Sequence, residues 1–301
     1  MTLVDVSIRD GLQDEAVFVD TASKARLAGE LFASGVTHVE ATSFVHPRWV
    51  PQLADADALV PQLPRGPRYS ALVLNRRGFE RAVAAFDGAG YAPGSYDLAY
   101  VTSASPRHAA ANNNRTIDET LAIFDDVAAA ARDHGVTIRA TIACAFVSPW
   151  ADERIDERDV LRSFERFAAG GARLVTLADT VGAADPRTVG ARIAAARALA
   201  PQMPLALHLH DSRGYALANI YAGLEAGVRT FEGALAGLGG CPFAPDAPGN
   251  LDLGKLAGFL EACGAQTGID HERLARAATQ IRAAVAAGTP IERATNAAVH
   301  A

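Results

Sequence analysis

The stretch LALHLHDSRGYALANIYAGLEAGVRTFEGALAGLGGCPFAPDAPGN, residues 205–250, decides the fold and carries the first candidate site. It predicts an apolar strand ending in two histidines, a helix after Gly214, a second strand, and a loop rich in glycine and proline. Alternate residues of a strand face the same side, so His208 and His210 can present two imidazoles in one direction. That spacing suits a pair of metal ligands. The alternative is a pair of hydrogen-bonded histidines in a buried strand.

The alternation of strand and helix continues in both directions from this stretch. Runs rich in β-formers predict strands at 3–8, 37–43, 69–74, 96–102, 137–145, 172–178, 203–209 and 228–235. Alanine-rich segments with helical periodicity predict helices at about 22–34, 50–60, 77–87, 117–133, 157–169, 186–199, 214–226 and 253–263. Such a series of strand–helix units without a long linker predicts an α/β fold, the (β/α)8 TIM barrel.

The competing architecture is an open, doubly wound sheet. It is disfavoured because no Gly-x-Gly-x-x-Gly motif follows the first predicted strand. Local signals agree with the predicted units. Asp185 and Pro186 supply an N-cap and a first-turn proline, and Gly35 and Gly135 follow helices at positions where a left-handed cap suits glycine.

We expect a single catalytic domain over residues 1–301, because a chain of this length can form one barrel. The barrel is expected at about 1–264, followed by a C-terminal helical extension at about 265–301 with a helix near 271–286. The tail after Thr289 is expected to be loose.

Composition restricts the partners. Half of the 301 residues are hydrophobic, and the net charge is -6 without a basic block, which disfavours nucleic acid and an anionic membrane as partners. No apolar run approaches the roughly 18 to 20 residues that span a bilayer. The amino terminus enters LVDVSI without a charged leader. We expect a soluble, cytoplasmic protein.

The cysteines and lysines of the chain disfavour two features, a disulfide framework and a lysine-dependent aldolase. Cys144, Cys241 and Cys263 are odd in number and far apart, which indicates a reducing compartment without a disulfide framework. Lys24 and Lys255 are the only lysines, and both fall in predicted helices. Neither is placed at a strand end to form a Schiff base, so a lysine-dependent aldolase is disfavoured.

A barrel assembles its active site at the carboxyl ends of its strands, so polar residues from distant segments can be pooled. Those expected at this face are Arg9, Asp10, Gln13, Glu40, Asp179, His208, His210, Cys241 and Asn250.

Four of these residues make a plausible ligand set. Asp10, His208, His210 and Asn250 offer two imidazole nitrogens and two oxygens, which suits six-coordinate Mg²⁺ or Mn²⁺, with Zn²⁺ also compatible. Taken singly, Asp10 could be a loop cap and Asn250 a turn residue. The combination points to a divalent metal cation.

Cys241 lies in the glycine-rich run 237–242, in a loop expected to be exposed. A thiol there can act as an acid or nucleophile if its surroundings tune its pKa. The same glycines could instead cradle a phosphate. Cys144, in an apolar strand, and Cys263, on a helix, are interpreted as inert.

Several motifs resemble the 3-hydroxy-3-methylglutaryl-CoA lyase family of metal-dependent TIM-barrel lyases, in order and spacing over nearly the whole chain. The matching motifs are Arg9-Asp10-Gly11-Leu12-Gln13, Glu40-Ala41-Thr42-Ser43-Phe44-Val45, Trp49-Val50-Pro51-Gln52, Asp179-Thr180-Val181-Gly182, His208-Leu209-His210-Asp211 and Gly237-Leu238-Gly239-Gly240-Cys241-Pro242-Phe243-Ala244. The cysteine loop, ending in Gly249-Asn250, is the most specific of them.

The resemblance implies a role for each matching position. Asp10, His208, His210 and Asn250 would be the metal ligands, and Arg9 would polarise the substrate carbonyl and stabilise enolate charge. Cys241 would be the loop thiol of proton transfer. Glu40 and Asp179 would be acids that support the site, and Gln13 would lie close to the substrate. The alternative for the two acids is a structural role, in a buried hydrogen bond or an ion pair with Arg9.

The implied reaction is retro-Claisen cleavage of an acyl-CoA, giving acetyl-CoA and a keto acid. A divalent ion lowers the pKa of the substrate hydroxyl, and Arg9 meets the developing enolate with a fixed positive charge. His208 and Asp10 are both candidates for the base that takes the hydroxyl proton, and the Cys241 thiol can protonate the acetyl-CoA carbanion.

The chain departs from the family pattern in loops expected at the substrate face. The departures include Pro106, Arg107, His108, Val147 and Ser148. The metal chemistry is therefore expected to be kept, while the acyl group could be another branched one. The alternatives are a condensing synthase and a non-catalytic barrel that only binds a ligand. The presence of Cys241 disfavours a condensing synthase. The complete set of metal ligands disfavours a non-catalytic barrel. A homo-oligomer, with a dimer as the simplest form, is expected.

Overall fold

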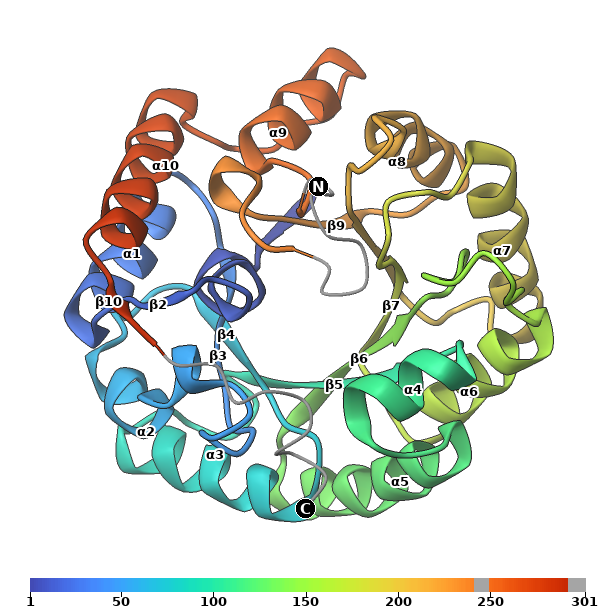
Figure 1. Ribbon diagram of the computed structural model, residues 1–301, viewed down its shortest axis with the longest axis horizontal. Coiled ribbons are helices and arrows are strands. Elements are labelled where there is room, and N and C mark those ends of the chain that lie inside the picture. The colour runs from blue at the N-terminus through green and yellow to red at the C-terminus, as the bar shows by residue number, and fades with distance from the viewer. Residues whose placement is uncertain (241–248, 292–301) are drawn as a thin grey trace.

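The computed structural model describes residues 1–240 and 249–291, and its centre is a closed barrel of parallel strands (Figure 1). The strands follow one another around the barrel as β1 (Thr2–Asp5), β3 (His38–Ser43), β4 (Arg68–Leu72), β5 (Asp97–Ser103), β6 (Thr137–Ala143), β7 (Leu174–Asp179), β8 (Leu205–Leu209) and β9 (Thr230–Gly233). Parallel pairing of β1 with β9 closes the ring. The predicted TIM barrel is confirmed.

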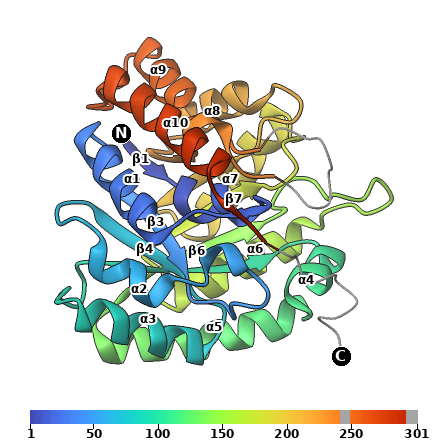
Figure 2. The same cartoon turned by 60° about the vertical axis from the view of Figure 1, so that its left-hand side comes forward.

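Helices surround the barrel. They are α1 (Thr21–Ala33), α2 (Ala56–Leu59), α3 (Arg76–Gly88), α4 (Pro106–Asn113), α5 (Ile117–His134), α6 (Glu157–Ala169), α7 (Pro186–Leu199), α8 (Ala216–Glu225), α9 (Leu253–Ala262) and α10 (His271–Ala286). Helix α10, the predicted additional C-terminal helix, packs beside α1 (Figure 2). The division into a barrel at 1–264 and an extension at 265–301 stays a prediction.

Side-chain caps set where helices begin. The Asp185 carboxylate accepts hydrogen bonds from the backbone N–H groups of Arg187 and Thr188, and Pro186 is the first residue of α7, as the sequence predicts. Helix α5 begins with a reciprocal capping box between Thr116 and Glu119.

The barrel wall separates an apolar layer from a polar interior. Outside the wall, the rings of Tyr100 on β5, Phe124 on α5 and Phe167 on α6 pack together with centroids 4.6–6.3 Å apart. Inside it, Arg139 on β6 donates to Glu232 on β9 across 2.7 Å. Since β6 and β9 are not neighbours in the ring, this ion pair crosses the interior. The site therefore stands above a charged layer.

The first strand is shorter than predicted. It ends at Asp5, and the chain turns into a π-helix at Ser7–Gly11. The Asp5 carboxylate accepts from both the N–H and the hydroxyl of Ser7, while the Ser7 hydroxyl accepts from the N–H of Leu235. These bonds compete with continuation of the strand and turn the following residues toward the barrel mouth.

Two helix predictions were wrong in detail. The expected helix at 50–60 is divided into short pieces at Pro51–Leu53, Ala56–Leu59 and Val60–Gln62, because proline limits helix continuation. Helix α4 was not predicted, although Ser105 caps it and Pro106 occupies its first position.

The expectation of a loose tail after Thr289 was wrong for its first residues. Thr289–Pro290 forms a strand, β10, that pairs antiparallel with β2 (Val17–Phe18). The N–H of Ile291 continues the contact by donating to the carbonyl of Ala16. Residues 292–301 lie outside the described part of the chain.

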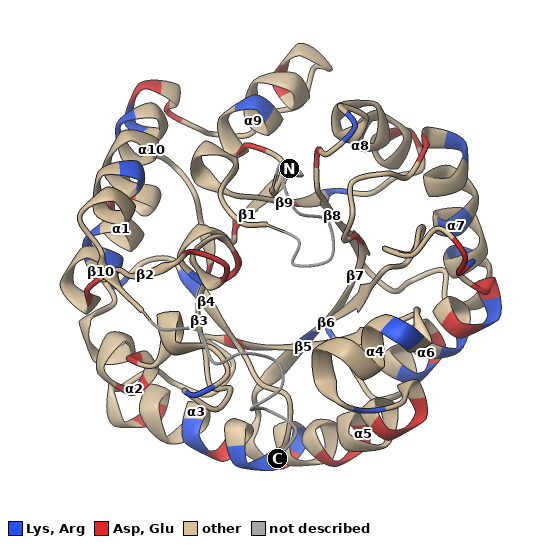
Figure 3. Cartoon of the chain, in the orientation of Figure 1, with Lys and Arg blue, Asp and Glu red and all other residues tan. Residues whose placement is uncertain are grey.

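Charges of both signs are mixed over the outer helices (Figure 3). Lys24 lies on α1 and Lys255 on α9, both helical as predicted. Within residues 1–240 and 249–291, every helix is too short or too polar to cross a lipid bilayer.

Candidate active site

Three of the predicted metal ligands meet at the mouth of the barrel. Asp10 lies on the π-helix after β1, His208 on β8 and His210 directly after β8. Each offers a ligand atom, and these atoms all lie within 4.8 Å of one another. His208 Nε2 is 3.9 Å from Asp10 Oδ2, and the two imidazole centroids are 5.3 Å apart. The cluster is a possible metal site.

The fourth predicted ligand, Asn250, reaches the same place from the other end of the loop. It forms an isolated bridge with His210, and its Nδ2 donates to Asp10 Oδ2 at 2.8 Å and to the carbonyl of Leu238 at 3.0 Å. Its Oδ1 is buried and has no hydrogen-bond partner among the described residues. A free amide oxygen, a carboxylate and two imidazoles fit a divalent cation.

The protonation states also suit metal binding. Burial would raise the pKa of Asp10, but Arg9, His208 and His210 together hold it well below its usual value. Burial, and then the charge of His208, lowers the pKa of His210 to about 4. These directions favour an ionised Asp10 and a neutral His210, which are the states that bind metals. At His208 burial acts to lower the pKa, but the hydrogen bond to Glu232 and the charge of Asp10 raise it.

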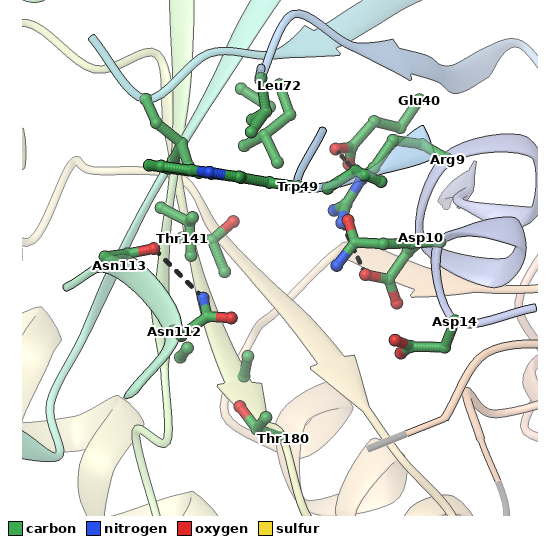
Figure 4. Close-up of a pocket in the computed structure, with 18 of the residues that line it drawn as sticks. Arg9, Asp10, Asp14, Glu40, Trp49, Leu72, Asn112, Asn113, Thr141 and Thr180 are labelled. Atoms are coloured by element: carbon green, nitrogen blue, oxygen red, sulfur yellow. Dashed lines mark hydrogen bonds and ion pairs between the residues drawn. The ribbon is translucent and has the colours of Figure 1, made fainter. Parts of the chain in front are cut away.

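Arg9 is held between two carboxylates. Its Nε donates to Glu40 Oε1 and its Nη1 to Asp10 Oδ1, both at 2.6 Å. Although burial acts to lower the pKa of Arg9, these two acids raise it above its usual value. The guanidinium is a permanent positive charge beside the cluster (Figure 4). The sequence interpretation of Glu40 as an ion-pair partner of Arg9 agrees with this geometry.

Asp179 is placed differently. Its Oδ2 accepts from the N–H of Ala184, and its backbone carbonyl accepts from the N–H of His210. Among the described residues it makes no ion pair with Arg9. Burial raises its pKa despite three backbone hydrogen bonds. These hydrogen bonds connect Asp179 to His210 and to the turn before α7, and the assignment of Asp179 as an acid that supports catalysis stays a prediction.

The two histidines of the cluster, His208 and His210, border a cavity of about 640 Å³. Gln13 contributes to its wall, as do Arg9, Asp10 and Glu40. The apolar residues of its lining are Leu72, Leu74, Ala99, Val101, Ala143 and Ala178, and the polar ones include Thr141, Thr180, Asn112 and Asn113. Trp49, with half of its surface exposed, also contributes (Figure 4). The cavity thus offers apolar surface as well as the charged cluster.

The loop between Gly240 and Gly249 includes Cys241, which falls outside the described residues. Its two ends are in contact, because a Cβ added at Gly249 would lie 1.7 Å from the carbonyl oxygen of Gly239. Only glycine allows this approach. Gly240, the residue before Cys241, contributes to the cavity wall.

Neither of the other two cysteines is among the residues that line the cavity. Cys144 is fully buried just after β6, and Cys263 is the half-buried residue that ends α9.

Two of the departures from the family pattern, Arg107 and Ser148, share a hydrogen-bond partner. Glu153 accepts from the hydroxyls of Ser105 and Ser148, each at 2.5 Å, and from the N–H of Arg107. Of the five departing residues, His108 alone contributes to the wall of the cavity formed by the described residues. Burial lowers the pKa of His108 to about 4. For the other four residues, the expected place in loops at the substrate face stays a prediction.

The sequence interpretation missed Glu232. Its Oε2 lies 3.1 Å from His208 Nδ1, and its Oε1 accepts from Arg139 and Thr176. Burial would raise the pKa of Glu232, but the hydrogen bond from His208 and the charge of Arg139 lower it to about 2. An acidic residue in the middle of a predicted barrel strand was the signal available in the sequence.

Comparison with known proteins agrees with this geometry. The HMGL-like family model matches residues 1–281. The hydroxymethylglutaryl-CoA lyase of Pseudomonas mevalonii is 37% identical over 281 residues, which are 93% of this chain and 90% of that protein.

Solved structures are similar over the same length. The HMG-CoA lyase of Brucella melitensis has a TM-score of 0.87 and 40% identity, covering 94% of this chain and 97% of that one. An HMG-CoA lyase from Acinetobacter baumannii, in complex with coenzyme A and 3-methylmalate, has a TM-score of 0.86 and 34% identity, covering 97% and 93%. The chain therefore belongs to the HMGL-like family and is a carbon–carbon lyase.

Proposed function

We propose that this lyase cleaves 3-hydroxy-3-methylglutaryl-CoA, or a related branched 3-hydroxyacyl-CoA, to acetyl-CoA and acetoacetate or another keto acid. The observation that carries the proposal is the meeting of Asp10, His208, His210 and Asn250 beside Arg9 at the mouth of the barrel, where all of them but Asn250 line the cavity. The names of the relatives and the coenzyme A bound by one of them support an acyl-CoA substrate.

A divalent cation, Mg²⁺ or Mn²⁺ with Zn²⁺ as the third choice, would be held by Asp10, His208, His210 and Asn250. When bound, such an ion makes a substrate hydroxyl more acidic and fixes its orientation. A set of two oxygens and two imidazole nitrogens without a thiolate suits the first two ions.

The residues of the chain supply the remaining chemistry. Arg9 stabilises the negative charge that develops on the thioester oxygen, and Glu40 holds the guanidinium in place through its Nε. Asp10 and His208 are the two groups at the cluster that can take the hydroxyl proton. Cys241 is assigned the return of a proton to the acetyl-CoA carbanion, and Gln13 contacts substrate from the cavity wall.

The condensing synthase is not favoured, because the relatives that match over nine-tenths of their length are named as lyases. No observation in the described residues supports a purely binding barrel either. A cytoplasmic location and a homodimer stay predictions. Light scattering of the purified protein and fractionation of the source cells would test them.

The deciding experiment is to incubate the purified protein with 3-hydroxy-3-methylglutaryl-CoA and to follow acetyl-CoA formation with Mg²⁺, with Mn²⁺ and after chelation. We expect metal-dependent turnover on the order of 1 to 10³ per second. Metal binding without any acetyl-CoA would contradict the substrate assignment. Full turnover after chelation would contradict the metal assignment.

A further inference from the structure

A buried row of three side chains runs from the metal cluster into the barrel. His208 on β8 contacts Glu232 on β9, and Glu232 contacts Arg139 on β6. Their side chains have at most a tenth of their surface exposed. Neither Glu232 nor Arg139 offers an atom to the metal cluster of Asp10, His208 and His210. The row lies behind the cluster and not in it.

The contact between Glu232 and His208 determines which imidazole nitrogen carries hydrogen. An ionised carboxylate only accepts hydrogen bonds, so His208 Nδ1 must be the N–H donor across the 3.1 Å contact. Neutral imidazole then has its lone pair on Nε2. That nitrogen is the one 3.9 Å from Asp10 Oδ2. The tautomer that faces the cluster is therefore the one able to bind a cation.

Arg139 fixes the orientation of Glu232. Its Nη2 donates to Oε1 at 2.7 Å, and the Thr176 hydroxyl donates to the same oxygen at 3.1 Å. This leaves Oε2 for His208. Arg139 is itself held, since its Nη1 lies 2.9 Å from His38 Nε2, which must accept because arginine has only donors.

We propose that Glu232 is a positioning residue that, oriented by Arg139, holds His208 as the Nδ1–H tautomer with Nε2 presented to the metal. The inference rests on the proposed metal site but concerns residues outside it. Outer-shell partners of this kind change metal affinity by roughly 10- to 100-fold when they are replaced.

The Glu232→Gln variant tests the proposal because glutamine has one acceptor and one donor end. Arg139 will attract the amide oxygen and repel the NH₂ group, which then faces His208 Nδ1. That nitrogen must now accept, and Nε2 gains the hydrogen. We expect Mn²⁺ affinity, measured by calorimetry, to fall about 10- to 100-fold.

The tautomer is read directly by ¹⁵N spectra of histidine-labelled protein at pH 9, where a neutral imidazole predominates. The His208 signals, assigned with a His208→Gln variant, should show Nδ1–H in the wild type and Nε2–H in Glu232→Gln. A wild-type spectrum with Nε2–H overturns the proposal without any variant. Unchanged tautomer and Mn²⁺ affinity in Glu232→Gln also overturn it.

Two further variants separate orientation from general loss of a buried charge. Asp55→Asn removes another mostly buried acid, which pairs with Lys24 outside the row, and should leave the His208 tautomer and Mn²⁺ affinity unchanged although it destabilises the protein. Arg139→Met combined with Glu232→Gln frees the amide to turn its oxygen toward His208. The double variant should bind Mn²⁺ more tightly than Glu232→Gln alone, and weaker binding counts against the proposal.

These results are independent of the substrate assignment. A wild type that binds Mn²⁺ and shows the expected tautomer, yet produces no acetyl-CoA, contradicts the proposed function and supports the role of Glu232. A wild type that cleaves the substrate but has the Nε2–H tautomer of His208 supports the proposed function and contradicts the role of Glu232.

Discussion

The amide nitrogen of Asn250 donates to Asp10 Oδ2 across 2.8 Å. The bond joins two residues that are 240 positions apart in the sequence. The bond holds Asn250 against the π-helix, and Asn250 Oδ1 is buried without a hydrogen-bond partner among the described residues. Asn250 therefore connects the chain that follows the cysteine loop to Asp10 of the metal cluster.

Replacing Asn250 by alanine should weaken Mn²⁺ binding by about tenfold or more, because a ligand oxygen and a support of Asp10 are lost together. Calorimetric titration measures the change. Asn75→Ala is the matched control, since Asn75 caps α3 and is not among the residues that line the cavity. It should cost about 1 kcal/mol of unfolding free energy and leave Mn²⁺ affinity unchanged. Equal Mn²⁺ affinity in wild type and Asn250→Ala would remove Asn250 from the ligand set.

Arg9→Lys keeps the charge but loses the two-sided contact with Glu40 and Asp10. Cleavage should slow by roughly 10² to 10³, as for loss of a donor to a developing oxyanion. Mn²⁺ stoichiometry should be kept. The surface variant Arg76→Lys, whose partner Glu80 is exposed, should keep full activity. A normal rate in Arg9→Lys would show that positive charge alone suffices.

Gly249→Ala should disturb the base of the loop, since its Cβ would lie 1.7 Å from the Gly239 carbonyl oxygen. We expect loss of activity and a lower melting temperature. Gly190→Ala, inside α7 with no atom within 4 Å of the new methyl, should instead stabilise by about 0.5–1 kcal/mol. If both variants behave alike in activity and in melting temperature, the contact between the loop ends is unimportant.

The sequence was sufficient to predict the barrel, because strand–helix alternation is local information. The pooling of Asp10, His208, His210 and Asn250 followed from barrel closure alone. The π-helix was not predictable in this way, since Ser7 depends on a hydrogen bond from Leu235, 228 residues away.

Two further features show the same limit. Glu232 and Arg139 are 93 residues apart, and only the folded barrel shows that they form a pair. The loop departures at Arg107 and Ser148 are compensated by Glu153, which no motif included.

Asp5 should make stability depend on pH. Burial raises the pKa of this carboxyl to about 7 in the folded protein, although hydrogen bonds from Ser7 act to lower it. The folded state therefore holds a proton that the unfolded state releases near pH 4. Its contribution to stability is fully present below that pH and is lost as pH rises to about 7, on the order of a few kcal/mol.

Urea unfolding of wild type and Asp5→Asn between pH 4 and 8 measures this effect. The stability of wild type relative to the variant should fall as pH rises through that range. A constant difference would show that Asp5 titrates alike in both states.

Cys241→Ala tests the assignment of the thiol. If the thiol delivers the proton that completes acetyl-CoA, its removal should slow cleavage by about 10² to 10⁴ while Mn²⁺ affinity stays within twofold, because no ligand has changed. Cys263→Ala, at the half-buried end of α9, is the matched control and should keep activity. The solvent deuterium isotope effect on the residual reaction should also change, since another donor replaces the thiol. If the Cys241→Ala enzyme is active and its isotope effect is unchanged, the proton donor is not the thiol but water or another residue of the cavity.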